Sequence, residues 1–64
     1  MTAQRIFKVD EDIFSINVFE GKNGGWLFVS VNNKTIFEQP GFETDDDALD
    51  FGEKYVQSYI FHKF

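Results

Sequence analysis

Apolar residues occupy both alternating sets of positions in two consecutive segments, and this pattern constrains the fold most. Alternation with a period of two in Ile13–Phe19 and Trp26–Val31 is typical of β-strands. One set of positions is wholly apolar: Phe14, Ile16, Val18, Leu27, Val29 and Val31. The other set mixes apolar with small polar residues: Ile13, Ser15, Asn17, Phe19, Trp26, Phe28 and Ser30. The pattern therefore predicts a sheet with two unlike faces, both of which carry apolar side chains.

Turn-forming residues separate these strands from each other and from a third strand. Glu20–Gly25 contains three glycines and an asparagine, which accept the positive φ angles of hairpin turns. A second tight turn, either Asn32-Asn33 or Asn33-Lys34, precedes a predicted strand at Thr35–Gln39. In either register Ile36 falls on the wholly apolar face, so Phe37 falls on the mixed face.

The two ends of the chain complete the predicted fold. Gln4–Val9 is a candidate fourth strand that ends at the acidic turn Asp10–Asp12. After Pro40-Gly41, Thr44 is in position to cap the N-terminus of a helix, with Asp47 three residues later. Residues at spacings of three and four then form an apolar stripe: Ala48, Phe51, Tyr55 and Tyr59, with Gly52 and Val56 beside them.

The stripe is expected to pack on the wholly apolar face, because that match removes the most apolar surface from water. The predicted fold class is α+β. We expect a single domain, residues 1–64, in which an antiparallel β-meander of three strands, or four with Gln4–Val9, carries one C-terminal α-helix on one face (β-β-β-α).

Composition argues against several classes of function. The chain has no cysteine and one histidine, His62, so we expect no disulfide, no metal site and no catalytic residues. We also expect no cofactor and no small-molecule substrate. Domains this small commonly gain stability from an aromatic core or from oligomerisation, and 19% of the residues are aromatic.

The charge of the chain disfavours anionic partners. Eleven acidic and six basic residues give a formal net charge of −5, which repels phosphate groups. Direct binding to nucleic acid or to a membrane surface is therefore not expected. The N-terminal residues lack a signal-peptide pattern, and no apolar run approaches the roughly 18 residues of a membrane span. We expect a cytoplasmic protein.

Several features between Trp26 and Tyr55 follow the order of a known type of module. Gly25-Trp26 enters a strand, and Phe42-Glu43-Thr44 leads into Asp47-Ala48 and Phe51 on the helix. This run resembles the three-stranded-sheet-plus-helix modules of the AP2 and integrase arm-binding type. The resemblance implies a fold whose open sheet face contacts DNA through arginine and lysine. The corresponding positions here carry no basic residue: Ser15, Asn17, Phe19, Trp26, Phe28, Ser30, Thr35 and Phe37.

The mixed face is the strongest functional candidate. Its four aromatic residues are Phe19, Trp26, Phe28 and Phe37. They would form an apolar patch larger than soluble monomers usually expose, and aromatic residues are enriched at binding hot spots. We interpret the patch as a binding surface for a protein partner or for a second copy of the chain. Alternatively, the N-terminal segment, or Phe61 and Phe64, folds over this face and completes an ordinary core.

The acidic residues at the predicted helix start suggest another function. These residues are Asp45, Asp46, Asp47 and Asp50. They could imitate the charges of a DNA backbone, which recur about every 1.7 Å along a duplex, and so block a nucleic-acid-binding protein. In composition the chain broadly resembles small acidic inhibitors made by phages and mobile elements. The simpler interpretation is helix capping and solvation. A metal site is not expected, because neighbouring helical positions point about 100° apart.

Overall fold

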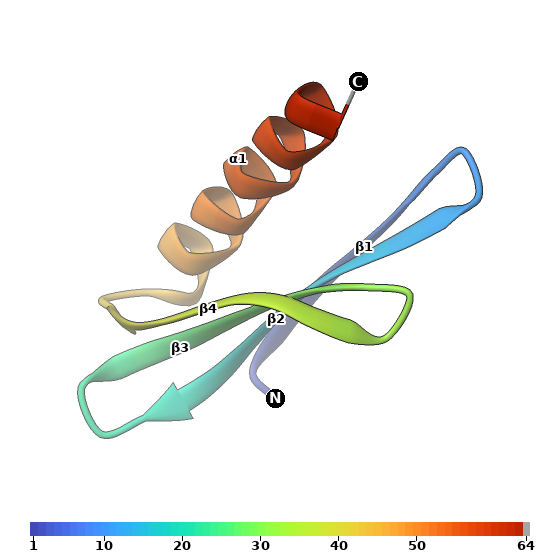
Figure 1. Cartoon of the computed structure of the whole chain (residues 1–64). Helices are drawn as coiled ribbons and strands as arrows, with labels where there is room; N and C mark the ends of the chain where they lie inside the picture. Colours follow the sequence, from blue (N-terminus) through green and yellow to red (C-terminus); the bar gives the residue numbers. More distant parts are fainter. Residues whose placement is uncertain (64) are drawn as a thin grey trace.

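The computed structural model describes residues 1–63, and the side chains of residues 1–62. Four strands precede one helix: β1 (Ala3–Val9), β2 (Asp12–Gly21), β3 (Gly24–Val31), β4 (Lys34–Phe42) and α1 (Asp45–Lys63). The strands form one antiparallel sheet in the order β1-β2-β3-β4, and α1 lies on one face of it (Figure 1). The predicted α+β meander with a C-terminal helix is confirmed, and the candidate strand at Gln4–Val9 is the edge strand β1.

Two-residue turns join all four strands. Asp10-Glu11 joins β1 to β2, Lys22-Asn23 joins β2 to β3, and Asn32-Asn33 joins β3 to β4. Asn32 and Asn33 have φ angles of 50° and 70°, a left-handed conformation that asparagine tolerates better than most residues. Of the two predicted registers, the turn at Asn32-Asn33 is therefore the one observed.

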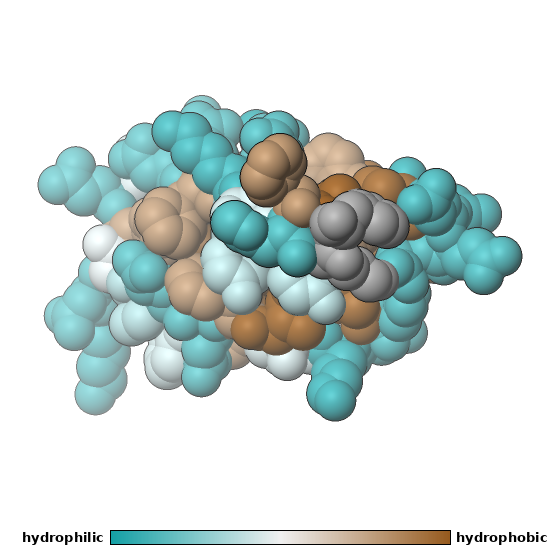
Figure 2. All heavy atoms as spheres, turned by 45° about the horizontal axis from the view of Figure 1, so that its top comes forward, coloured by the Kyte–Doolittle hydropathy of each residue, from teal (hydrophilic) through white to brown (hydrophobic). Residues whose placement is uncertain are grey.

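The core lies between α1 and the wholly apolar face of the sheet. Its buried residues are Phe14, Ile16, Val18, Leu27, Val29, Ala48, Leu49 and Val56. Seen from the side of α1, hydrophobic residues gather in the middle of the molecule and hydrophilic residues extend at both ends (Figure 2). The helix approaches the sheet closely at Gly52, where an added Cβ would lie 2.5 Å from Ile16 Cγ2.

Phe37 was predicted on the mixed face, and the structure places it on the helix face. Ser30 pairs with Thr35 whereas Val29 pairs with Phe37, so Ile36 is an extra residue in β4. This β-bulge reverses the alternation of side chains along the strand. The ring of Phe37 stacks on Tyr55 of α1 with centroids 4.3 Å apart. Ile36 also packs against the core, as predicted.

The alternative covers for the mixed face are not observed in the described residues. The N-terminal segment does not fold over the sheet, because it extends the sheet sideways as β1. Phe61 lies on α1, on the other side of the sheet, and its side chain is 78% exposed. Phe64 lies outside the described residues.

Candidate functional site: the open sheet face

The sheet face opposite α1, here called the open face, has no helix or strand packed on it within residues 1–63 (Figure 1). The strand registers place on this face the residues Gln4, Ile6, Lys8, Ile13, Ser15, Asn17, Phe19, Trp26, Phe28, Ser30, Thr35 and Glu38. Most of these residues are exposed or half-buried, and Ser30 in the middle of the sheet is buried.

Three of the four predicted site residues form one cluster on the open face. Phe19 and Trp26 are direct cross-strand partners on β2 and β3. The ring of Phe28 meets the ring of Phe19 edge-on, with their centroids 5.3 Å apart, and stacks on the ring of Trp26, with their centroids 5.7 Å apart. Such pairs are favourable beyond the area that they bury, so the rings hold one another in place. We call Phe19, Trp26 and Phe28 the aromatic cluster.

The aromatic cluster remains accessible to solvent. Phe19 is 41% and Trp26 is 40% exposed, while Phe28 is half-buried between them. Trp26 separates two shallow depressions. One is lined by Asn17, Phe19, Trp26, Phe28 and Thr35. The other is lined by Glu20, Gly21, Lys22, Asn23, Gly24, Trp26 and Pro40. Trp26 therefore lines two depressions at this end of the open face.

The polar side chains beside the cluster bind one another. Gln4 Nε2 donates a hydrogen bond to Asn17 Oδ1 at 2.6 Å, and Ser15 Oγ donates one to the same oxygen at 3.0 Å. The structure leaves no buried side-chain polar atom without a hydrogen-bond partner in the described residues. Two donors on this face therefore already share Asn17 Oδ1 as their acceptor.

A second apolar patch lies on the open face and was not part of the predicted site. Ile6 on β1 is 60% exposed and Ile13 on β2 is 48% exposed. Sequence alternation places Ile13 on this face, but the register of β1, and so the position of Ile6, depends on pairing with β2. The register gives the open face two charged side chains among the described residues, Lys8 and Glu38, which lie on the outer strands β1 and β4.

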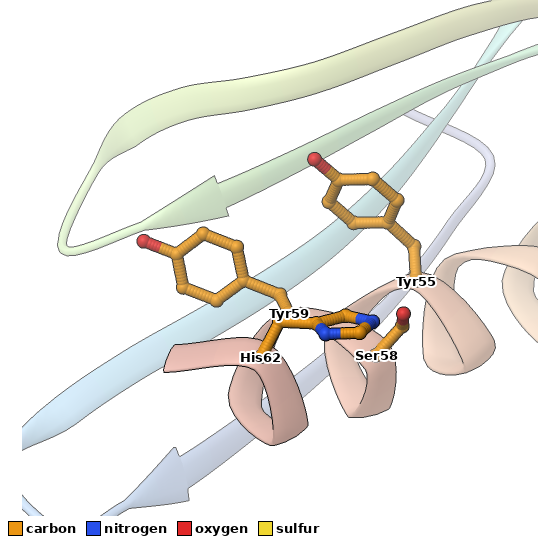
Figure 3. Close-up of a pocket in the computed structure, with 4 residues that line it drawn as sticks. All are labelled: Tyr55, Ser58, Tyr59 and His62. Atoms are coloured by element: carbon orange, nitrogen blue, oxygen red, sulfur yellow. The ribbon is translucent and has the colours of Figure 1, made fainter. Parts of the chain in front are cut away.

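A hollow beside α1 contains the single histidine of the chain. It is lined by Tyr55, Ser58, Tyr59 and His62, all from the helix, and both tyrosine rings point toward the sheet (Figure 3). Tyr55 stacks on Phe37 and Tyr59 meets Phe14 edge-on at 5.9 Å. His62 contacts Phe61 at 5.6 Å. The tyrosine rings therefore pack against the sheet, and Ser58 and His62 line the same hollow from successive turns of the helix.

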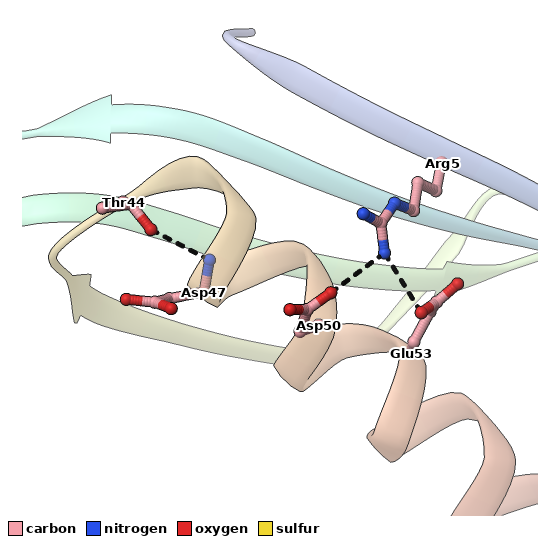
Figure 4. Close-up of polar contacts among 5 residues, drawn as sticks. All are labelled: Arg5, Thr44, Asp47, Asp50 and Glu53. Carbon is pink, nitrogen blue, oxygen red and sulfur yellow. Dashed lines mark hydrogen bonds and ion pairs between the residues drawn. The ribbon is translucent and has the colours of Figure 1, made fainter.

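The acidic helix start takes part in holding the fold together. Thr44 Oγ1 accepts a hydrogen bond from the backbone N–H of Asp47 at 3.0 Å, which confirms the predicted N-cap (Figure 4). Asp45 accepts a hydrogen bond from Thr2 at 3.1 Å. Arg5 Nη1 lies 3.3 Å from Asp50 Oδ1 and 3.1 Å from Glu53 Oε2, so it ties β1 to α1 (Figure 4). Asp46 and the other three predicted acidic-surface residues are exposed.

Comparison of the chain with protein-family models, with curated proteins and with solved structures finds no match. Among the described residues, no group of three or more side chains could hold a metal ion. No helix in the same part of the chain has the length and apolarity required to cross a membrane.

Proposed function

We propose that the protein is a non-enzymatic interaction domain that binds another protein surface through the open face. One observation carries the proposal: the helix covers one apolar face of the sheet, and the other face presents three mutually packed aromatic rings to solvent. Rings that already contact one another lose little conformational freedom on binding, and such preorganisation lowers the entropic cost of association.

The exposed fractions give the scale of the binding energy. An aromatic side chain buries roughly 150–250 Å², so the 40% that remains exposed on Trp26 is about 60–100 Å². At about 25 cal/mol per Å², covering it contributes about 1.5–2.5 kcal/mol. Phe19 is similarly exposed, and the two together contribute about 3–5 kcal/mol. Association itself costs about 4–15 kcal/mol, so a partner must also cover the rest of the open face.

The acidic helix start has a secondary role in this proposal. Its carboxylates lie on the helix side of the molecule, away from the aromatic cluster. Charges placed there alter which partners approach and how fast, more than they alter the final affinity. Mimicry of nucleic acid is the alternative function for these residues. Asp50 is paired with Arg5 and Asp45 binds Thr2, and these structural contacts favour the interaction domain.

The test compares Trp26→Ser and Phe28→Ser with the matched control Phe61→Ser. Phe61 is a more exposed aromatic residue, but it lies on α1 away from the open face. Far-UV circular dichroism first establishes that each variant folds. We expect the two open-face variants to lose self-association, or the capture of proteins from a native-host lysate, while the control keeps it. Unchanged mass in solution and unchanged capture by folded Trp26→Ser and Phe28→Ser would refute the proposal.

A further inference from the structure

The aromatic cluster has a geometry that suits pairing with its own copy. Phe19 and Trp26 lie opposite each other on β2 and β3, the two central strands. A two-fold axis that runs along the strands, between β2 and β3, places Phe19 of each copy over Trp26 of the other. The same operation places Phe28 over Asn17, because these two residues are also cross-strand partners. Interfaces of this kind use one self-complementary patch on both subunits.

The outer strands are also compatible with this axis. The rotation places β1 of one copy over β4 of the other. Ile6 and Thr35 are the two outermost residues of one row of cross-strand partners, which runs Ile6, Ser15, Ser30 and Thr35. Ile6 of one copy therefore faces Thr35 of the other. Lys8 and Glu38 lie in different rows, and neither is placed over a residue of like charge. No charged side chain of the described open face lies within the central strands that carry the aromatic cluster.

The area of the open face matches what a small dimer requires. Strands lie about 4.8 Å apart and rise about 3.3 Å per residue. The four strands lie side by side over the rows of Phe14 to Val18, and β2 and β3 continue together to Gly21. These two parts span about 19 Å by 17 Å and about 10 Å by 10 Å, or about 410 Å² in projection. The accessible area of a surface roughened by side chains exceeds its projection. Two copies thus reach the roughly 1,000 Å² that a specific interface needs.

The negative charge of the chain does not oppose this arrangement. The formal net charge of the chain is −5, but on the open face the positive charge of Lys8 and the negative charge of Glu38 sum to zero. Stacked sheets are about 10 Å apart, and each α1 lies outside its own sheet. The two acidic helix starts are then separated by more than the Debye length of about 8 Å at physiological ionic strength. Their mutual repulsion is largely screened.

We infer that the open face binds a second copy of this chain, sheet on sheet, about a two-fold axis that runs along the strands between β2 and β3. The inference rests on the proposed function and gives it a partner. The aromatic clusters of the two copies cover each other, and the dimer has four layers: helix, sheet, sheet, helix. The exposed isoleucines of β1 and β2 are covered in the same contact.

The experiment measures mass and tryptophan emission against concentration. In sedimentation velocity between ~10 µM and ~1 mM, a range that spans the dissociation of modest interfaces, the mass should rise from 7.5 kDa toward twice that value. Trp26 is the only tryptophan, so its emission should move to shorter wavelength over the same range. We expect Trp26→Ser and Thr35→Lys to stay monomeric and Phe61→Ser to dimerise like the wild type.

Thr35→Lys keeps the test decisive if Trp26→Ser does not fold. Thr35 is exposed in the monomer, and in the dimer the new ammonium group would face Ile6 of the other copy. A wild-type mass that stays at 7.5 kDa at every concentration would overturn the inference, as would undiminished dimerisation of Thr35→Lys. If the wild type is monomeric yet the open-face variants lose a captured protein, the second copy is wrong as partner and the proposed function stands.

Discussion

Gly52 is buried where α1 lies close against the sheet. A methyl group there would lie 2.5 Å from Ile16 Cγ2 and 3.2 Å from Leu27 Cδ1. Both of those side chains are fully buried, and carbon atoms pack at about 3.5–4.0 Å. The added methyl group could therefore be accommodated only if the helix or Ile16 moved. We expect Gly52→Ala to destabilise the fold, although alanine is the better helix former.

The expected decrease in the free energy of unfolding is the difference between two opposing contributions. Alanine in place of glycine within a helix stabilises by about 1 kcal/mol. Overpacking a close-packed core costs about 1–3 kcal/mol, and an overlap of at least about 1 Å with Ile16 places this site at the upper end. The free energy of unfolding should fall by about 2 kcal/mol. For a domain of this size each kcal/mol shifts Tm by about 4–8 °C, so Tm should fall by about 8–16 °C.

Thermal unfolding monitored by circular dichroism measures this change. All proteins are compared at one low concentration, because self-association would make Tm depend on concentration. Ser58→Ala is the matched control, since Ser58 is exposed on the same helix and reports helix propensity alone. The losses caused by Gly52→Ala and Ile16→Ala should be less than additive in the double variant, because Ile16→Ala frees the space that the new methyl group needs. A Tm equal to or above that of the wild type, or additive effects in the double variant, would refute the reasoning.

Four further predictions concern other parts of the structure. Thr44→Ala should lower the free energy of unfolding by about 1 kcal/mol through loss of the N-cap, measured by the same thermal unfolding. Phe37→Ala should lower the free energy of unfolding by about 3 kcal/mol, because Phe37 packs under α1. Phe19→Ala should lower it by about 1 kcal/mol, because Phe19 is 41% exposed. Equal losses for the two variants in urea unfolding would contradict this placement of Phe37. Arg5→Ala should cost at most about 1 kcal/mol, and the difference from the wild type should shrink in high salt. Replacing the four aspartates of the helix start together by Asn should leave binding through the open face intact; these are Asp45, Asp46, Asp47 and Asp50. Binding that weakens steeply as the salt concentration rises would instead support nucleic-acid mimicry.

The position of the helix stripe illustrates a limit of sequence reasoning. Spacing alone predicts that the stripe of Ala48, Phe51, Tyr55 and Tyr59 faces the sheet, with Gly52 and Val56 beside it. In the structure the small residues Ala48 and Gly52 lie at the centre, and Phe51 is 40% exposed. Small side chains allow the helix to approach the sheet closely, so the rings of Phe51 and Tyr55 lie at the flank and pack on β4. Helical spacing identifies one side of a helix, but the depth of contact is set by what the sheet offers.

In the candidate site too, some features follow from the local sequence and others depend on how the strands pair. Alternation along β2 and β3 is a local property with a period of two, and it correctly places Phe19, Trp26 and Phe28 on one face. The prediction for Phe37 was wrong because it extends the alternation across a strand that contains a bulge, and nothing in Thr35–Gln39 marks the extra residue. Ile6 joins the open face through the register of β1 against β2, which is likewise a property of strand pairing.

The sequence by itself determined the elements, their order, the Thr44 cap and the two-sided apolar character of the central strands, because each depends on residues within a few positions of one another. The tertiary structure alone decided the bulge at Ile36, the close approach at Gly52 and the absence, within residues 1–63, of a cover over the open face. These features depend on which surfaces remain available once the strands have paired and the helix has packed. That is a property of the whole fold, and no local pattern carries it.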